Sequence, residues 1–268
     1  MALRSALINV MTGAARKAAR TLVHDFGEVE QLQVSMKGPA DFVSAADRRA
    51  EQILLAELTS ARPRYGALLE ESGEIQGKDT SNRWIVDPLD GTLNFLHGIP
   101  HFCLNIAVER DGEIIAGVTY DPLRDEMFWA ERGAGAYLNR NRLRVSTRER
   151  LETAVLATGL PPRQRRNHRG FAAELSAMTP KTAGIRRLGS AALDLAYVAA
   201  GRLDGFWEKG LGPWDLAAGI VLVREAGGFV GEMGGGSDMM NTGDVIAAND
   251  RLFDPIGETL RSAASEGQ

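Results

Sequence analysis

The residues best suited to chemistry lie in one short segment in the first third of the chain. An apolar run at 84–86 leads directly into Asp87, Pro88, Asp90 and the pair Gly91-Thr92. Pro88 keeps Asp87 extended and prevents an immediate helix, so both carboxylates can turn toward one point. Gly91 lets the backbone approach a ligand closely, and the amides of Gly91 and Thr92 could face a phosphate if a helical turn starts there. The alternative interpretation is an ordinary turn containing Asp-Pro and Asp-Gly.

Three further segments place acids at the ends of apolar or helical patterns. Glu70 follows a short apolar run, Asp215 opens a helical pattern, and Asp47 stands three residues after Ser44, in a segment that begins with Lys37. Each acid also has a purely structural interpretation. Glu70 fits a solvated loop, Asp215 an N-terminal helix charge, and Asp47 the acid of a capping box.

A cluster of these carboxylates would favour a hard divalent cation. Mg²⁺ prefers oxygen ligands and typically takes a few carboxylates together with water and substrate phosphate oxygens. Without a cation, several clustered carboxylates repel each other. A zinc site is poorly supported, because the chain has four histidines and one cysteine, and His97 and His101 fit loop positions better than ligand positions.

The composition describes an ordinary globular protein. The 268 residues, 44% of them hydrophobic, suffice for one large domain or two tightly joined small ones. The net charge of −4 provides no global basic field for nucleic acid, so a phosphate substrate has to be attracted locally, as a bound cation would do. The single cysteine, Cys103, is typical of a reducing compartment, and no apolar stretch is long enough to span a membrane. We therefore expect a cytoplasmic protein.

Hydrophobic periodicity predicts the elements that position the acids. Helices are predicted over 3–26, from 44 to before 63, over 170–178, 190–200 and 214–226, and after 251. Strands are predicted at 84–86, 103–108, 114–120, 127–130, 154–157, 185–188, 206–208 and 245–248, with a hairpin at Asp111-Gly112. The pattern changes near residue 148. We therefore predict an α+β half, 1–148, carrying most metal ligands, and an α/β half, 149–268, contributing Asp215 and substrate contacts.

In chain order, the acidic segments resemble those of the inositol monophosphatase family. The resemblance spans roughly residues 35–230 and is carried by Lys37 with Ser44-Ala-Ala-Asp47, Glu70-Glu71-Ser72, Asp87-Pro-Leu-Asp90-Gly-Thr92 and Trp214-Asp215. It implies an αβαβα layered sandwich of α+β and α/β parts, two to three Mg²⁺ ions for each site, lithium sensitivity and a homodimer. Two positions depart from the commoner family pattern, Leu69 before the glutamates and Leu93 after Thr92, but neither removes a ligand.

The resemblance also implies roles for individual residues. One metal would be held by Glu70, Asp87 and the Leu89 carbonyl group, and a second by Asp87, Asp90 and Asp215. A metal-activated water, oriented by Glu70 and Thr92 with Asp47 in the proton relay, would attack phosphorus without a phosphoenzyme. Lys37 would be accessory, in the loop that orders a weaker third metal. Substrate contacts would come from Asp90, Gly91, Thr92, Ser190, Ala191, Glu208 and Asp215.

The predicted reaction is hydrolysis of a small phosphate monoester, with myo-inositol monophosphate as the first choice. Fructose-1,6-bisphosphatase, histidinol-phosphate phosphatase and nucleotide phosphatase activities use the same scaffold and stay open. Ser190 also fits a helix N-cap, which does not exclude a substrate contact, and the alternative for Glu208 is a surface acid paired with Lys209. A second class of function is a regulator that has kept the fold and binds transcription machinery or nucleic acid. Its support is the basic run from Arg163 to Arg169, which also fits a solvated face.

Overall fold

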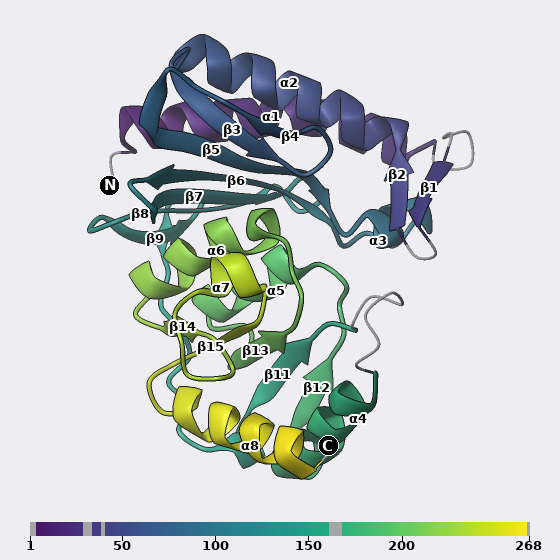
Figure 1. The fold of residues 1–268 in the computed structure, drawn as a ribbon, viewed down its shortest axis with the longest axis vertical. Coiled ribbons are helices and arrows are strands. Elements are labelled where there is room, and N and C mark those ends of the chain that lie inside the picture. The colour runs from purple at the N-terminus through teal and green to yellow at the C-terminus, as the bar shows by residue number, and fades with distance from the viewer. Residues whose placement is uncertain (1–3, 29–33, 39–40, 161–167, 267–268) are drawn as a thin grey trace.

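Helical and sheet layers alternate through the molecule. The structure, a computed structural model, describes residues 4–28, 34–38, 41–160 and 168–266, with the backbone alone for 34–38, 41–44 and 265–266. Figure 1 shows helices α1 and α2 above a large sheet, α5 and α6 beneath it, then a smaller sheet, and α4 and α8 on the far side. The predicted αβαβα sandwich is therefore confirmed.

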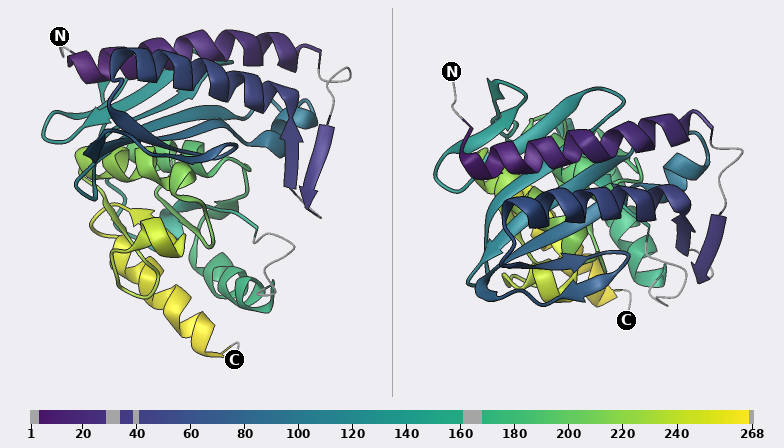
Figure 2. Two further views of the ribbon diagram at one scale, coloured as in Figure 1. Left: turned by 45° about the horizontal axis from the view of Figure 1, so that its top comes forward. Right: turned by 90° about the horizontal axis from the view of Figure 1, so that it is seen from above.

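The helices follow the predicted periodicity, with differences of a few residues at their ends. Their bounds are α1 Ala6–Phe26, α2 Ala45–Ala61, α3 Thr92–Leu96, α4 His168–Met178, α5 Ala191–Ala199, α6 Pro213–Glu225, α7 Met239–Thr242 and α8 Phe253–Glu266. Figure 2 shows α1 and α2 side by side across the outer face of the large sheet. Within the described residues, no helix is long and apolar enough to cross a bilayer.

The large sheet has eight strands in the order β10-β9-β8-β7-β6-β5-β3-β4. Their bounds are β3 Tyr65–Leu69, β4 Gly73–Ile75, β5 Asp79–Asp90, β6 Cys103–Arg110, β7 Glu113–Asp121, β8 Glu126–Glu131, β9 Gly135–Leu138 and β10 Asn141–Arg142. The predicted hairpin joins β6 to β7, where Asp111 and Gly112 have φ values of 50° and 80°. Strands β1 Val34–Gly38 and β2 Asp41–Ser44 form a separate antiparallel pair.

The small sheet has five strands in the order β12-β11-β13-β15-β14. Their bounds are β11 Val155–Thr158, β12 Gly184–Arg186, β13 Gly205–Glu208, β14 Phe229–Gly231 and β15 Val245–Ala248. Strand β11 runs parallel to β12 and β13, and β15 is antiparallel to both of its neighbours. The proposed division near residue 148 falls between the strands of the large sheet and those of the small one.

Helix α6 contacts strands β5 to β9 of the large sheet at close range because the facing residues are small. Ala217 and Ala218 of α6 form a buried cluster with Ile85 and Ala107 of the sheet. At Gly117 of β7, a Cβ atom would lie 2.7 Å from the Ala218 Cα atom, so the helix backbone rests almost on the strand. This contact fixes the start of α6, and with it Asp215, relative to β5.

Candidate active site

A bulge in β5 brings Asp87 and Asp90 to the same side of the strand. Two residues three positions apart in a regular strand point to opposite faces. Here Asp87 pairs with Asn105 and Asp90 pairs with Cys103, so three steps along β5 match two steps along β6. The extra residue reverses the alternation for the following side chain. Pro88 lies within this irregular stretch, where the ladder does not need its missing N–H group.

The parallel neighbour β3 places Glu70 beside Asp87. Leu69 pairs with Val86, and the Glu70 N–H group donates to the Val86 carbonyl oxygen at 3.2 Å. The next residue on each strand is therefore a carboxylate. After burial, the neighbouring charge of Glu70 is the largest contribution to the raised pKa of Asp87.

Helix α6, which packs against the large sheet, supplies a fourth carboxylate group. Asp215 lies in the first turn of α6, and its Oδ2 atom accepts from the Gly212 N–H group at 2.7 Å. Asp87, Asp90 and Asp215 each offer an oxygen atom, and these atoms all lie within 4.8 Å of one another. Segments 128 residues apart in the chain thus converge on one point, as the combination of acids predicted.

The electrostatics of this cluster favour a cation. Burial, followed by the neighbouring charges of Glu70, Asp90 and Asp215, raises the pKa of Asp87 well above its ordinary value. Burial and the charges of Asp90 and Glu70 likewise raise the pKa of Asp215. The Asp87 Oδ2 atom is buried and has no hydrogen-bond partner. A set of oxygen donors with an unpartnered buried oxygen fits a hard divalent cation, which would offset the repulsion.

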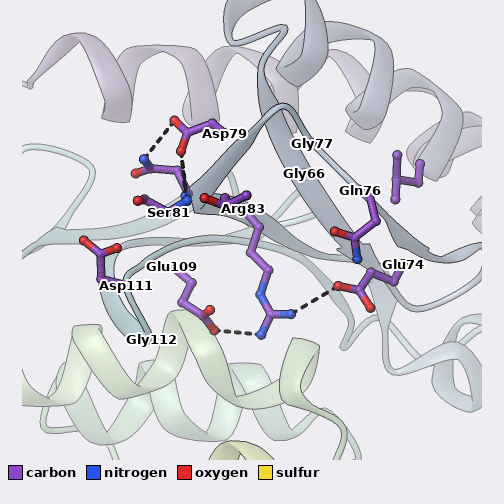
Figure 3. A pocket seen from close by; sticks show the side chains of 13 residues that line it. Gly66, Glu74, Gln76, Gly77, Asp79, Ser81, Arg83, Glu109, Asp111 and Gly112 are labelled. Atoms are coloured by element: carbon purple, nitrogen blue, oxygen red, sulfur yellow. Dashed lines mark hydrogen bonds and ion pairs between the residues drawn. The ribbon is translucent and has the colours of Figure 1, made fainter.

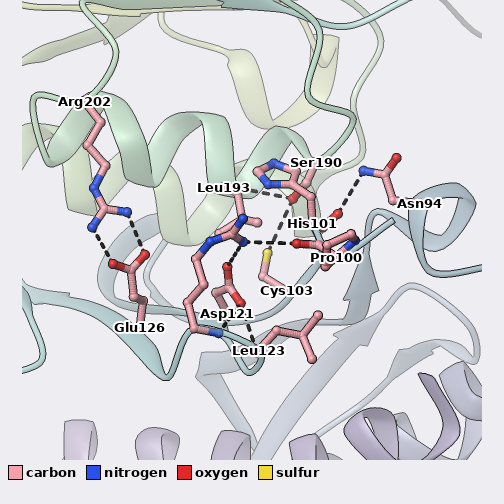
Figure 4. A network of polar contacts seen from close by, with 11 residues as sticks. Asn94, Pro100, His101, Cys103, Asp121, Leu123, Glu126, Ser190, Leu193 and Arg202 are labelled. Atoms are coloured by element: carbon pink, nitrogen blue, oxygen red, sulfur yellow. Dashed lines mark hydrogen bonds and ion pairs between the residues drawn. The ribbon is translucent and has the colours of Figure 1, made fainter. Parts of the chain in front are cut away.

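Asp90 is held by the N-terminus of α5. Its Oδ2 atom accepts from the Ser190 hydroxyl group at 2.6 Å and from the Ala192 N–H group at 2.8 Å. Burial raises the pKa of Asp90, whereas these bonds and those from the Ala191 and Gly91 amides lower it. Ser190 also caps α5, because its Oγ atom accepts from the Leu193 N–H group, so the N-cap interpretation is confirmed and the contact with substrate stays a prediction. Figure 4 shows Ser190 beside Cys103, which is buried.

The turn after β5 adopts the conformation that the glycine suggested. Gly91 has a φ of +94° and precedes α3, so a helical turn does start at Thr92. A Cβ atom at Gly91 would lie 3.0 Å from the His101 carbonyl oxygen, so a larger residue is doubly disfavoured there. The Thr92 hydroxyl group donates to the Leu89 carbonyl oxygen at 2.9 Å, and the Leu89 N–H group donates to Asp87 Oδ1 at 2.8 Å.

The remaining predicted residues come from more distant elements. Asp47 lies in the first turn of α2 and is 1% exposed. Lys37 lies in β1, where the structure describes the backbone alone, so its predicted role stays a prediction. Ala191 opens α5 next to Ser190 and is largely buried.

Glu208 ends β13 and is half-buried among other acids. Burial, followed by the charges of Asp194, Asp215 and Asp90, raises its pKa well above the ordinary value. Its carboxylate lies against the backbone of Gly159, where a Cβ atom would overlap it. The alternative interpretation paired Glu208 with Lys209, but Lys209 forms its ion pair with Glu174. The pairing of Glu208 with Lys209 is therefore not found among the described residues, and the contact of Glu208 with substrate stays a prediction.

Asp194 and Asn105 are among the polar residues near the site that sequence reasoning missed. Asp194 of α5 is 1% exposed, and burial followed by the charge of Asp90 raises its pKa. Asn105 of β6 accepts from the Thr119 hydroxyl group at 2.6 Å and donates to the Trp214 carbonyl oxygen at 3.4 Å, next to Asp215. Each is a polar residue within an otherwise apolar segment, and this contrast could have identified both residues from the sequence.

A second polar pocket lies at the opposite end of β5. Its volume is about 290 Å³, and its lining includes Glu74, Asp79, Glu109 and Asp111 with the single cation Arg83. Figure 3 shows the Arg83 guanidinium group between Glu74 and Glu109, to which it is ion-paired. Two of its acids are therefore already neutralised, whereas the acids that converge closely enough to hold a cation among the described residues are Asp87, Asp90 and Asp215, so the candidate active site stays with that cluster at the other end of the strand.

The comparisons with known proteins agree with this geometry. A model of the inositol monophosphatase family matches residues 3–265, and the chain belongs to that family. The protein is accordingly a phosphoric monoester hydrolase. It is 59% identical to a Mesorhizobium japonicum protein named inositol-1-monophosphatase, with 92% of this chain and 93% of the relative covered.

Other relatives carry a different name on the same fold. The chain is 43% identical to the Escherichia coli protein named Nus factor SuhB, with 97% of both chains covered. The crystal structure of the extragenic suppressor protein suhB from Bartonella henselae superimposes with a TM-score of 0.94 at 56% identity, covering 96% of this chain and 99% of the other.

Proposed function

We propose that the protein hydrolyses a small phosphate monoester in the presence of Mg²⁺, with myo-inositol monophosphate as the preferred substrate. The observation that carries this proposal is the convergence of the Asp87, Asp90 and Asp215 oxygen atoms around one buried point. Identity of 59% to a protein named inositol-1-monophosphatase supports the choice of substrate. Fructose bisphosphate, histidinol phosphate and nucleotides are the competing substrates.

In this proposal the metal ligands are those that the sequence predicted. Glu70, Asp87 and the Leu89 carbonyl group would hold one ion, and Asp87, Asp90 and Asp215 a second. Bound Mg²⁺ supplies positive charge for the phosphoryl oxygens and increases the acidity of water. The unpartnered Asp87 Oδ2 atom is consistent with its role in both sets.

The side chains then orient water and substrate. The Thr92 hydroxyl group donates its one hydrogen to the Leu89 carbonyl oxygen. The hydroxyl oxygen can therefore still accept a hydrogen bond from the attacking water. Glu70 would accept a proton from that water, with Asp47 as the next member of the relay and Lys37 as an accessory residue.

The leaving group would occupy the opposite side of the cluster. Ser190 and Ala191 at the start of α5 would face its hydroxyl groups, as would Glu208. Asp90 would contact both metal and leaving group, and Gly91 would offer its amide to the phosphate. The half-buried position of Glu208, close enough to Asp215 for that charge to raise its pKa, supports this arrangement, because its carboxylate can accept hydrogen bonds from the hydroxyl groups of a polyol.

A panel of phosphate esters tests the proposal. Purified protein is titrated with MgCl₂ in the presence of inositol monophosphate, fructose bisphosphate, histidinol phosphate, a nucleoside 3′-phosphate and p-nitrophenyl phosphate. The expected result is release of phosphate that depends on Mg²⁺ and is fastest, by kcat/KM, for inositol monophosphate. Full activity in a chelator would refute the metal requirement, and a faster competing ester would replace the substrate. Inhibition by millimolar Li⁺, homodimer formation and a cytoplasmic location stay predictions.

Association with transcription machinery is the second candidate function. The observation in its favour is 43% identity to a protein named Nus factor SuhB. The basic run that suggested it, Arg163 to Arg169, lies outside the described residues except at His168 and Arg169. RNA retention that falls with salt and persists in the Asp87→Asn variant would support this role, and absence of retention at low salt would exclude RNA binding by the chain alone.

A further inference from the structure

Asn94 joins the two sides of the candidate active site through one amide group. It lies in α3, two residues after Thr92, and is 5% exposed. Its Nδ2 atom donates to the carbonyl oxygens of His101 at 2.8 Å, Leu188 at 2.9 Å and Gly189 at 3.4 Å. An amide nitrogen has two hydrogens, so the two shorter bonds take one each. Figure 4 shows the amide directed at the backbone next to Pro100 and His101.

The surroundings of the Asn94 Nδ2 atom accept only a hydrogen-bond donor at this position. Three carbonyl oxygens face the Nδ2 atom, and an oxygen atom in its place would repel all of them. Gly189 packs directly against the amide: it has a φ of +91°, and a Cβ atom there would lie 3.0 Å from Nδ2. The segment before α5 is therefore seated on Asn94 by both hydrogen bonds and close packing.

The same two segments meet again at Asp90. Leu188 and Gly189 lead directly into Ser190, whose hydroxyl group donates to Asp90 Oδ2. On the other side, Asp90 is followed after three residues by Asn94. The stretch from Asp90 to Asn94 and the stretch from Leu188 to Ala192 are thus joined at both ends, by Asp90 at one end and by Asn94 at the other.

We propose that Asn94 is a positioning residue for the leaving-group side of the site. By holding Leu188 and Gly189 against α3, its amide fixes Ser190 and Ala191 relative to Asp90, where the polyol of the substrate binds. Asn94 itself touches no reacting atom. The inference rests on the proposed function, since it assigns the segment from 188 to 192 to substrate binding.

Two substitutions and a matched control test the role. Asn94→Asp keeps the shape but removes both N–H donors, and Asn94→Ala removes them without adding a charge. Asn249→Asp is the control, because Asn249 is 2% exposed and donates from Nδ2 to the carbonyl oxygens of Ser146 and Arg148, both at 2.9 Å. Asn249 lies at the end of β15 that is away from Glu208. It follows Ala248, which pairs with Gly205, whereas Glu208 pairs with Val245 at the other end of the strand.

The first measurement compares two esters. In both Asn94 variants, KM for inositol monophosphate should rise roughly tenfold while KM for p-nitrophenyl phosphate, which lacks a polyol, changes less than about threefold. Asn249→Asp should lower the melting temperature and leave both KM values unchanged. Unchanged KM values in the Asn94 variants, or an equal rise for both esters, would overturn the inference.

The second measurement needs no turnover. The rate of hydrogen exchange is measured in the metal-free protein at the Ala192 amide, which donates to Asp90. Its exchange should accelerate in the Asn94 variants relative to amides of α1, and not in Asn249→Asp. If the wild type hydrolyses no ester, the proposed function fails while this readout still judges the positioning role; unchanged exchange at Ala192 would refute that role by itself.

Discussion

Asp87 combines full burial with a carboxylate oxygen that has no partner among the described residues. Leu89 satisfies its Oδ1 atom, but Oδ2 faces the charges of Glu70, Asp90 and Asp215. An isolated buried charge is unfavourable, whereas a cation held between these carboxylates would compensate for the same charge. In the proposed metal site, the buried charge of Asp87 that is unfavourable in the metal-free protein would therefore be a charge that holds the cation.

Asp87→Asn should lower kcat/KM by at least about a hundredfold, because direct ligands matter more than the outer partners that cost 10–100-fold. The same change should stabilise the protein in a chelator by about 1 kcal/mol, because it removes a buried charge and keeps the shape. Steady-state kinetics and chelator melts of one preparation measure both effects. Asp79→Asn, at the solvent-exposed start of the same strand, is the control and should leave kcat/KM unchanged. Retained activity in Asp87→Asn would remove Asp87 from the metal ligands.

Glu208→Gln should change the choice of substrate more than the chemistry at phosphorus. Its carboxylate lies in the acidic site but is assigned to the polyol, so loss of acceptor strength should cost about 1–3 kcal/mol on a polyol ester. That loss corresponds to a fall in kcat/KM of roughly one to two decades. The measurement compares inositol monophosphate with p-nitrophenyl phosphate. Equal losses on both esters would place Glu208 with the metal or structural residues, and no loss on either would remove it from the site.

The individual acids were predictable from the sequence, but their arrangement was not. Asp87 and Asp90 stand out because a strand pattern ends in acids around a proline, and the resemblance to a family added Glu70 and Asp215. The bulge that aligns Asp87 with Asp90 depends on pairing with β6, which is set by residues outside the segment. Asn94 was not recognised, because its partners at 188 and 189 lie 94 and 95 residues away.

At the scale of elements, small residues let α6 lie close to the large sheet. Gly117→Ala should therefore destabilise the protein by about 1–3 kcal/mol, since the new Cβ atom would lie 2.7 Å from both the Ala218 Cα atom and the Val221 Cγ1 atom. Relief of this overlap requires α6 to move, so activity per folded molecule should also fall, because α6 carries Asp215. Urea unfolding and kinetics measure the two effects.

Gly13→Ala is the matched control for this packing argument. Gly13 lies in the middle of α1, and a Cβ atom there meets nothing within 4 Å. The same substitution should stabilise the protein by about 0.5–1 kcal/mol through helix propensity and leave activity unchanged. If Gly117→Ala behaves like Gly13→Ala, close packing of α6 does not position the site.

Whether an element was predicted from the sequence depended on its length and on its hydrophobic pattern. The long helices and the apolar strands were predicted within a few residues. Strand β5 was recognised only at 84–86, because its first part, from Asp79 to Asn82, is polar and lies at an exposed end of the sheet. Strand β14 was not predicted, because three residues at a sheet edge leave no periodic signal. The stacking of the two halves in layers was predicted from the pattern of helices and strands, whereas the αβαβα order was implied by the resemblance to the family.

For the whole molecule, the modest net charge of −4 conceals a concentration of buried negative charge at one point. Burial and mutual repulsion raise the pKa values of Asp87 and Asp215 above their ordinary values. Between the ordinary and the raised pKa, the folded protein therefore binds more protons than the unfolded chain does. The free energy of unfolding then falls as pH rises through that window, starting at about pH 4.

Mg²⁺ should oppose this loss, and more strongly at higher pH, because only deprotonated carboxylates bind the ion. At a Mg²⁺ concentration of about 100 times Kd, the added stability is about 2.7 kcal/mol, or roughly 5–8 °C in melting temperature. Thermal unfolding with EDTA or MgCl₂ at intervals from pH 5 to 8 measures the difference. We expect a small Mg²⁺ shift near pH 5, a large one near pH 8, and a much smaller one throughout for Asp87→Asn. A Mg²⁺ shift that is equal at both pH values, or one that Asp87→Asn preserves, would show that the stabilising ion binds outside the Asp87 cluster.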